Sequence, residues 1–162
     1  MQAVLEAKIM KLLKITDQNR ELVSVLRELR RNARFRSMRR FVQHGSTSTY
    51  THCENVAALS LRLAGWLPGP IDRTHLVRGA FLHDFYLYDW HIPDASHRLH
   101  GFSHAAKALE NADRQFSLSD TERNIIYSHM WPMNLTHLPH CREAVLVCLS
   151  DKLCALGETF RR

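Results

Sequence analysis

An apolar stretch broken by one polar pair occupies residues 79–88 and reads Gly79-Ala80-Phe81-Leu82-His83-Asp84-Phe85-Tyr86-Leu87-Tyr88. Its composition suits a buried helix, yet His83 and Asp84 are metal-binding side chains, and burying them costs desolvation free energy unless something compensates it. A bound cation would compensate that cost. The stretch therefore indicates a metal site in the core of a helical protein.

Helical periodicity continues on both sides of this stretch, so the predicted fold class is all-α, a helical bundle. A Ser or Thr within residues 45–49 can cap a helix from Tyr50 to Ala64, and Asp72 can cap the helix that carries the His-Asp pair near its end. Further helices are expected over Val4–Leu13 and Leu22–Leu29, from about His104 to Ala112 behind a Ser103 cap, from the Ser119 capping box to His129, and from Cys141 to Phe160.

The last of these helices has apolar residues at the spacing typical of a core-facing side. These are Val145, Leu149, Leu153 and Leu156, with Asp151 among them. We therefore expect the four apolar side chains to be buried in the bundle.

Length and composition favour one domain of 162 residues with an ordinary apolar content of 45%. We expect residues 1–44 to form a helical segment packed on or extending the domain, and residues 45–162 to form the metal-binding domain. No apolar stretch is long enough to suggest a membrane span, and no signal peptide is evident. The four cysteines form no CxxC pair, which favours a reducing compartment and a cytoplasmic protein.

The net charge of +6 is concentrated in one segment, where six arginines fall within eleven residues. They are Arg30, Arg31, Arg34, Arg36, Arg39 and Arg40. Such a cluster can bind phosphate, and nucleic acid is a possible partner through Arg30–Arg40. A solvated helix face is the favoured interpretation, because no nucleic-acid-binding motif accompanies the cluster.

Among eleven histidines, an ordered set places one member or pair on each successive expected helix of the predicted bundle. The set is His52, His83 with Asp84, His104, His129 and Asp151. This order resembles the signature of the HD superfamily of metal-dependent phosphohydrolases, a His, a His-Asp pair and a distant Asp on a helical bundle. The further histidines His104 and His129 resemble the extended signature of members that bind two metals, and the resemblance covers roughly residues 45–157.

The resemblance implies a dinuclear site. The first metal would be held by His52, His83, Asp84 and Asp151. Asp84 would bridge to a second metal held by His104 and His129, with a metal-activated water between the ions. Imidazole and carboxylate ligands suit Mn, Fe, Co, Ni or Zn, and a ligand set without thiolate argues against a closed structural zinc site. The implied activity is hydrolysis of a phosphomonoester or phosphodiester bond in a nucleotide or another small phosphorylated substrate.

Residues that would hold the phosphate are less clearly marked by the sequence. Lys152 and Arg98 are the proposed catalytic side chains besides Asp84, with Arg78 and Lys107 as weaker candidates. His97 and His100 compete with His104 for the ligand role, although His104 is favoured. Tyr88, Trp90 and Trp131 could stack on a base, with core or surface packing as the alternative.

Two other functions remain open at this level. Some HD proteins are di-iron oxygenases with a similar ligand set, and a non-catalytic metal-containing regulatory module is the third alternative. The HD-GYP phosphodiesterases typically have a lysine where this chain has Leu87, and their Gly-Tyr-Pro signature is missing. Cyclic di-GMP is therefore not the favoured substrate. The sequence leaves the oligomeric state open and favours no membrane partner.

Overall fold

Helices make up most of the chain in the computed structural model, which describes residues 19–95 and 98–160. The helices are α2 (Asn19–Arg31), α3 (Ala33–Ser37), the short 3-10 helix η1 (Met38–Arg40), α4 (Thr49–Ala64), α5 (Arg73–Leu82), α6 (His100–Gln115), α7 (Asp120–Ser128) and α8 (Arg142–Phe160). A small antiparallel pair, β1 (Val42–His44) and β2 (Thr47–Ser48), precedes α4. The all-α prediction is confirmed.

Three helix starts follow from short polar side chains that satisfy free backbone N–H groups. Ser48 accepts a hydrogen bond from Thr51 N at the start of α4, and Asp72 accepts one from His75 N at the start of α5. Ser119 and Glu122 form a complete capping box at α7. These caps set where each helix begins and hence which residues reach its inner face.

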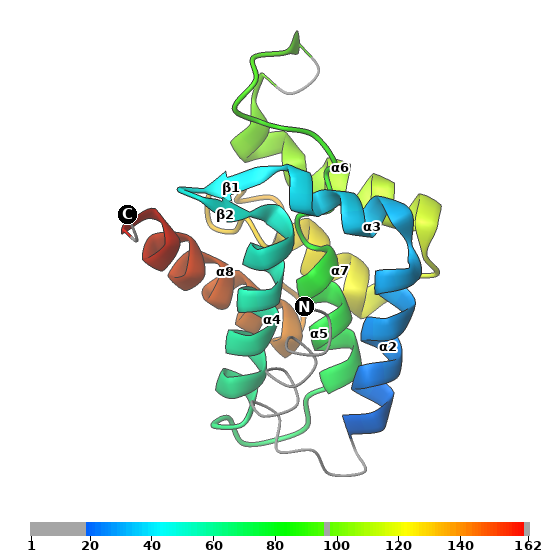
Figure 1. Ribbon diagram of the computed structural model, residues 1–162. Helices are drawn as coiled ribbons and strands as arrows, with labels where there is room; N and C mark the ends of the chain where they lie inside the picture. The colour runs from blue at the N-terminus through cyan, green and yellow to red at the C-terminus, as the bar shows by residue number, and fades with distance from the viewer. Residues whose placement is uncertain (1–18, 96–97, 161–162) are drawn as a thin grey trace.

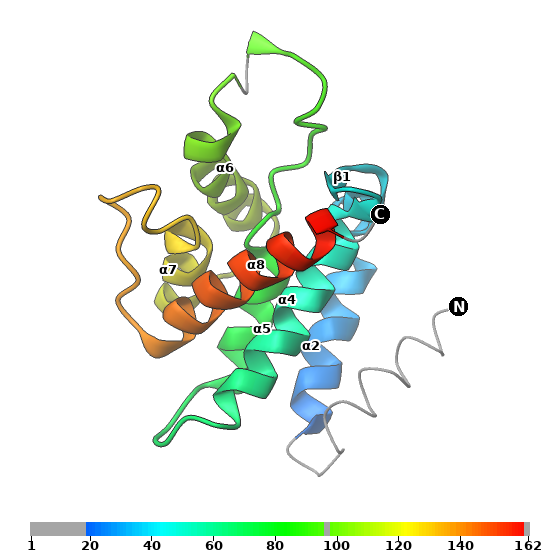
Figure 2. The ribbon, with the colours of Figure 1, turned by 90° about the vertical axis from the view of Figure 1, so that its left-hand side faces the viewer.

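The helices α2, α5 and α4 run side by side, and α8 crosses α4 (Figures 1 and 2). Helix α7 packs against α5 and α8, and α6 packs on α7. The β1–β2 pair lies at the beginning of α4 (Figure 1). This arrangement brings the ends of α5 and α7 and the middle of α8 towards one region of the core.

The described part of the N-terminal segment contributes to that core. Phe35 of α3 is 1% exposed, and its ring lies 5.4 Å from Tyr50 and 5.9 Å from Phe81, measured between ring centroids. Leu29 and Met38 are fully buried in the same cluster. Residues from α2 to η1 therefore share one hydrophobic core with α4 and α5.

Close packing of α5 on α7 depends on a glycine. A Cβ atom at Gly79 would lie 2.6 Å from Ile125 Cδ1, which is closer than carbon atoms approach in a packed core. His83 lies one helical turn after Gly79, and His129 lies one turn after Ile125. The ring centroids of the two histidines are 4.8 Å apart. The small residue therefore lets two candidate ligands meet.

Helix α6 begins earlier than the sequence predicts. Its first residue is His100, and its N-cap Leu99 makes no side-chain capping bond. Ser103 therefore does not cap the helix; its Oγ donates to the Leu99 carbonyl from within the first turn. A helix that starts without a capping side chain carries no recognisable start signal, which explains the error.

The expected orientation of α8 is wrong. The four apolar residues assigned to the core are about half exposed: Val145 52%, Leu149 48%, Leu153 47% and Leu156 58%. The buried face instead contains Ala144, Val147, Asp151 and Glu158. Polar side chains face inwards because they belong to the buried site described below, so α8 presents apolar residues to solvent.

Two further expectations concern the amphipathic N-terminal segment and membrane-spanning helices. The amphipathic segment Val4–Leu13 lies outside the described residues. Within the described residues, no helix combines the length and the apolar character needed to cross a membrane.

Candidate metal centre

Six buried side chains from five helical segments converge in the core, and they are the six that the sequence pattern singles out. His52 comes from α4, His104 from α6 and Asp151 from α8; His83 and His129 are the C-cap residues of α5 and α7, and Asp84 follows His83. None is more than 8% exposed. Three groups of ligand atoms each lie within 4.8 Å of one another: His52, His83 and Asp84; His83, His129 and Asp151; Asp84, His104 and His129.

The two carboxylate oxygens of Asp84 face different histidines. Oδ1 lies 3.4 Å from His104 Nε2 and 3.5 Å from His129 Nε2. Oδ2 lies 3.4 Å from His83 Nε2 and 3.8 Å from His52 Nε2. The carboxylate therefore stands between two histidine pairs, the position that a bridging ligand would need.

Every one of the four histidines has its Nδ1 engaged away from the centre. His83 Nδ1 lies 2.7 Å from Ala80 O, His104 Nδ1 2.7 Å from His100 O, and His129 Nδ1 2.7 Å from Ile126 O. His52 Nδ1 lies 2.8 Å from Glu158 Oε2. Because these oxygens are acceptors, Nδ1 carries the proton in the neutral form of each ring, and in that form Nε2 can offer a lone pair to a metal.

The remaining polar atoms are satisfied poorly without a cation. His104 Nε2 and His129 Nε2 lie 2.9 Å apart, yet both rings donate through Nδ1, so in their neutral form two lone pairs face each other. His83 Nε2 and Asp84 Oδ1 are buried without a hydrogen-bond partner in the described part of the chain. Buried groups of this kind are normally paired, so the donor set fits divalent metal ions.

Charges in the cluster are strongly coupled. Burial alone would lower the pKa of His52, but hydrogen bonds with Asp151 and Glu158 raise it to about 10. Burial would raise the pKa of Asp84, yet the charge of His83 and the nearby imidazoles of His104 and His83 hold it well below its usual range. Burial lowers the pKa of His129 to about 3. The imidazoles of His52 and His83 likewise lower the pKa of Asp151, so both aspartates are anionic and His129 is a neutral lone-pair donor.

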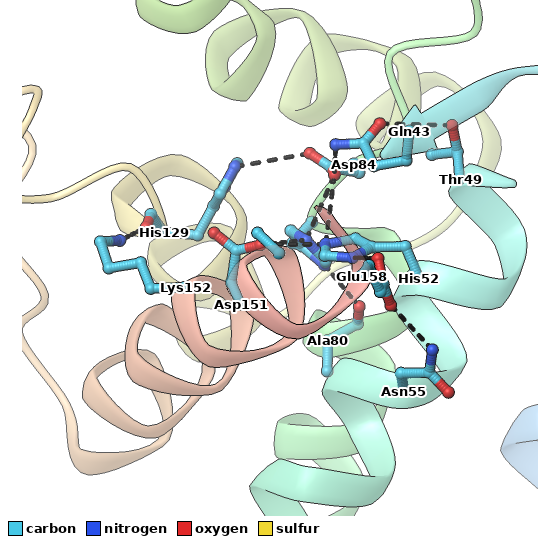
Figure 3. Close-up of polar contacts among 12 residues, drawn as sticks. Gln43, Thr49, His52, Asn55, Ala80, Asp84, His129, Asp151, Lys152 and Glu158 are labelled. Carbon is cyan, nitrogen blue, oxygen red and sulfur yellow. Dashed lines mark hydrogen bonds and ion pairs between the residues drawn. The ribbon is translucent and has the colours of Figure 1, made fainter. Parts of the chain in front are cut away.

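Gln43 of β1 contacts the cluster although no sequence signal marks it. Its side-chain nitrogen donates to Asp84 Oδ2 at 2.7 Å, as Figure 3 shows. Its Oε1 accepts a hydrogen bond from Tyr86 and lies 3.4 Å from Thr49 Oγ1. With both ends of its amide engaged, Gln43 fixes the rotation of the carboxylate that separates the two histidine pairs.

Glu158 is a second residue that sequence reasoning missed, although its spacing could have found it. It lies two helical turns after Asp151, so both carboxylates share the inner face of α8. Besides His52, it binds Asn55, whose Nδ2 donates to Oε1 at 2.8 Å (Figure 3). Burial raises the pKa of Glu158, but the hydrogen bond with His52 outweighs it and leaves the carboxyl below its usual range. Its negative charge increases the basicity of His52.

The candidate phosphate-binding cations lie apart from the six residues or are engaged elsewhere. Lys152 Nζ donates to His129 O at 2.9 Å (Figure 3) and also to Cys148 O at 3.3 Å. Arg98 is exposed and lines a surface pocket with Trp90 and Pro93. Arg78 forms ion pairs with Glu28 and Glu122, and Lys107 pairs with Glu110.

A column of stacked rings leads from the loop after the His-Asp pair to the cluster. Trp90 stacks on His100 with ring centroids 5.1 Å apart, and His100 stacks on His104 at 4.5 Å. The Tyr88 hydroxyl lies 2.8 Å from His100 Nδ1. His100 therefore stands behind His104, while His97, the other competitor for its role, lies outside the described residues.

Comparison with protein families gives one match, a family model described as HD domain, over residues 49–156. The matched range includes all six clustered residues and excludes Gln43 and Glu158. The comparisons with curated proteins and with solved structures gave no match.

Proposed function

The chain belongs to the HD domain family, and on this premise we propose that it is a phosphohydrolase that uses two divalent metal ions. HD domains bind divalent metals, and the buried histidines and aspartates form clusters that could hold them. The proposed substrate is a small phosphomonoester or phosphodiester, such as a nucleotide. The observation that carries the proposal is the placement of Asp84, with one carboxylate oxygen towards each histidine pair.

In this proposal the first metal is held by His52, His83, Asp84 and Asp151, and the second by Asp84, His104 and His129. Divalent ions at such a site supply Lewis acidity, which activates water as a nucleophile and neutralises charge on phosphoryl oxygens. The side chains around the site set the geometry. The backbone carbonyls and Glu158 fix the imidazole tautomers, and Gln43 fixes the carboxylate.

Phosphate binding is proposed for Arg98 and Lys152. Arg98 has an exposed guanidinium that can form two hydrogen bonds with one phosphate. Lys152 is next to Asp151, but its ammonium group must first release the carbonyl of His129. A substrate contact by Lys152 would therefore require a local change at the end of α7.

The test combines elemental analysis of anaerobically purified protein with a panel of phosphomonoesters and phosphodiesters. We expect two metal ions per chain and hydrolysis of at least one class of substrate. The Asp84→Ala variant should lose both metals and the activity, whereas the control Asp113→Ala, which removes an exposed surface carboxylate, should keep both.

Two outcomes would overturn the proposal. Metal-loaded protein that hydrolyses nothing in the panel but shows a mixed-valent iron signal and consumes oxygen would favour the oxygenase alternative. Near-full metal occupancy in Asp84→Ala would exclude the bridging role of that carboxylate.

A further inference from the structure

Helix α8 carries an exposed apolar stripe that the metal centre does not use. It consists of Val145, Leu149, Leu153, Leu156 and Phe160, which are 52%, 48%, 47%, 58% and 77% exposed. At 100° per residue, the five side chains fall within an arc of about 80° on the helix surface, along a length of about 22 Å. No other described element covers this face, and Figure 2 shows the outer side of α8 turned towards the viewer.

The orientation of α8 is fixed by its polar inner face. Asp151 lies 2.9 Å from His52 Nε2, and Glu158 lies 2.8 Å from His52 Nδ1. Rotating the helix to bury the stripe would withdraw both carboxylates from the cluster. The apolar side chains are therefore held at the surface by the same contacts that build the site.

We propose that this stripe is the interface of a homodimer, in which α8 packs antiparallel against α8 of a second copy. The spacing of the five residues reads nearly the same in both directions. An antiparallel pair centred between positions 152 and 153 places Val145 opposite Phe160 and Leu149 opposite Leu156, with Leu153 beside the two-fold axis. A surface that complements itself under a two-fold rotation is what an isologous dimer requires.

The area is also consistent with a dimer. Burying the exposed parts of the five residues in two copies removes on the order of 1,000 Å² of surface from water, before flanking residues are counted, which reaches the lower range of specific interfaces. At about 500 Å² per copy, the stripe matches the largest apolar patch of a typical monomer, and patches of that size are often interaction sites.

Sedimentation equilibrium of the metal-loaded chain of 162 residues from about 1 to 100 µM tests the proposal. We expect a monomer–dimer equilibrium, and the variant Leu149→Arg with Leu153→Arg should raise the dimer dissociation constant by about 100-fold or more, because two charges from each copy would enter the centre of the interface. The matched control is Leu135→Arg, at a leucine that is 73% exposed outside α8, and it should leave the dissociation constant unchanged. A wild-type chain that stays monomeric throughout this range overturns the proposal.

The antiparallel register has its own test. Leu149→Glu combined with Leu156→Lys places opposite charges across the two-fold axis, so it should dimerise about 10-fold more tightly than Leu149→Glu alone. Leu149→Glu combined with Val145→Lys puts the lysine opposite Phe160 and should show no such recovery. Equal behaviour of the two double variants overturns the register. A monomer that co-sediments with phosphatidylcholine vesicles would instead assign the stripe to a lipid surface and overturn the dimer.

Discussion

The hydrogen bond between His52 and Glu158 offers the sharpest probe of the proposed metal centre. Glu158 accepts from His52 Nδ1 through one oxygen and from Asn55 Nδ2 through the other, both at 2.8 Å. Glu158→Gln keeps the shape but replaces one acceptor by an NH₂ group, which must then face one of the two donors. Losing a charge-assisted hydrogen bond of this kind costs about 1.5–3 kcal/mol.

If His52 is a metal ligand, losing this hydrogen bond makes its imidazole less well oriented and less basic. We therefore expect the metal affinity to fall by about 10- to 100-fold. Competition with a colorimetric chelator, measured for Zn²⁺ and Mn²⁺, gives the affinity directly. The control Glu110→Gln changes an exposed carboxylate on α6 that pairs with Lys107 and should have no effect. An affinity within about threefold of wild type in a folded Glu158→Gln variant would refute the role of His52.

The other predictions concern the second site, protonation and the core. His104→Ala should empty chiefly the second metal site, giving about one ion per chain by elemental analysis, and unchanged stoichiometry would argue for His97 or His100. The pKa of His52 is raised from 6.5 to about 10, so its protonated form stabilises the metal-free, chelator-treated protein fully below pH 6.5. The urea midpoint of that protein should therefore fall as the pH rises from 6.5 to 10, and a rise would contradict the prediction. Nearby carboxylates raise the pKa of both His52 and His83, so metal loading near pH 7.5 should release protons from them, measurable by calorimetry in buffers of different ionisation enthalpy. Phe35→Ala should cost about 3–5 kcal/mol in urea unfolding; a cost below 1 kcal/mol would separate the N-terminal segment from the core.

Much of the fold could be predicted because local signals agreed with the tertiary structure. Asp72 and the Ser119 capping box mark helix starts that the structure contains. Helical spacing and chain order, together with the resemblance to the HD signature, singled out the six side chains that converge. Their role as metal ligands stays a prediction.

The errors and omissions have physical causes. The apolar residues of α8 have the spacing of a core face, but the opposite face carries Asp151 and Glu158 of the buried site and packs inwards. Periodicity alone does not determine which side of a helix turns inwards. Gln43 contacts Asp84 across 41 residues of sequence, from a segment without periodic pattern. Long-range polar contacts of this type arise from the packing of whole elements, and no local spacing encodes them.

The contacts of Gln43 and Glu158 bear on where the working unit of this protein begins and ends. Both residues lie outside the matched range 49–156, and so does Phe35, which packs on Tyr50 and Phe81 within it. A fragment cut at the edges of that range would keep all six converging side chains but lose the supports of two of them and part of the core. The matched range alone is therefore not a self-sufficient unit in this chain. Transferring the site to another protein would require including the flanking residues that hold Asp84 and His52 in place.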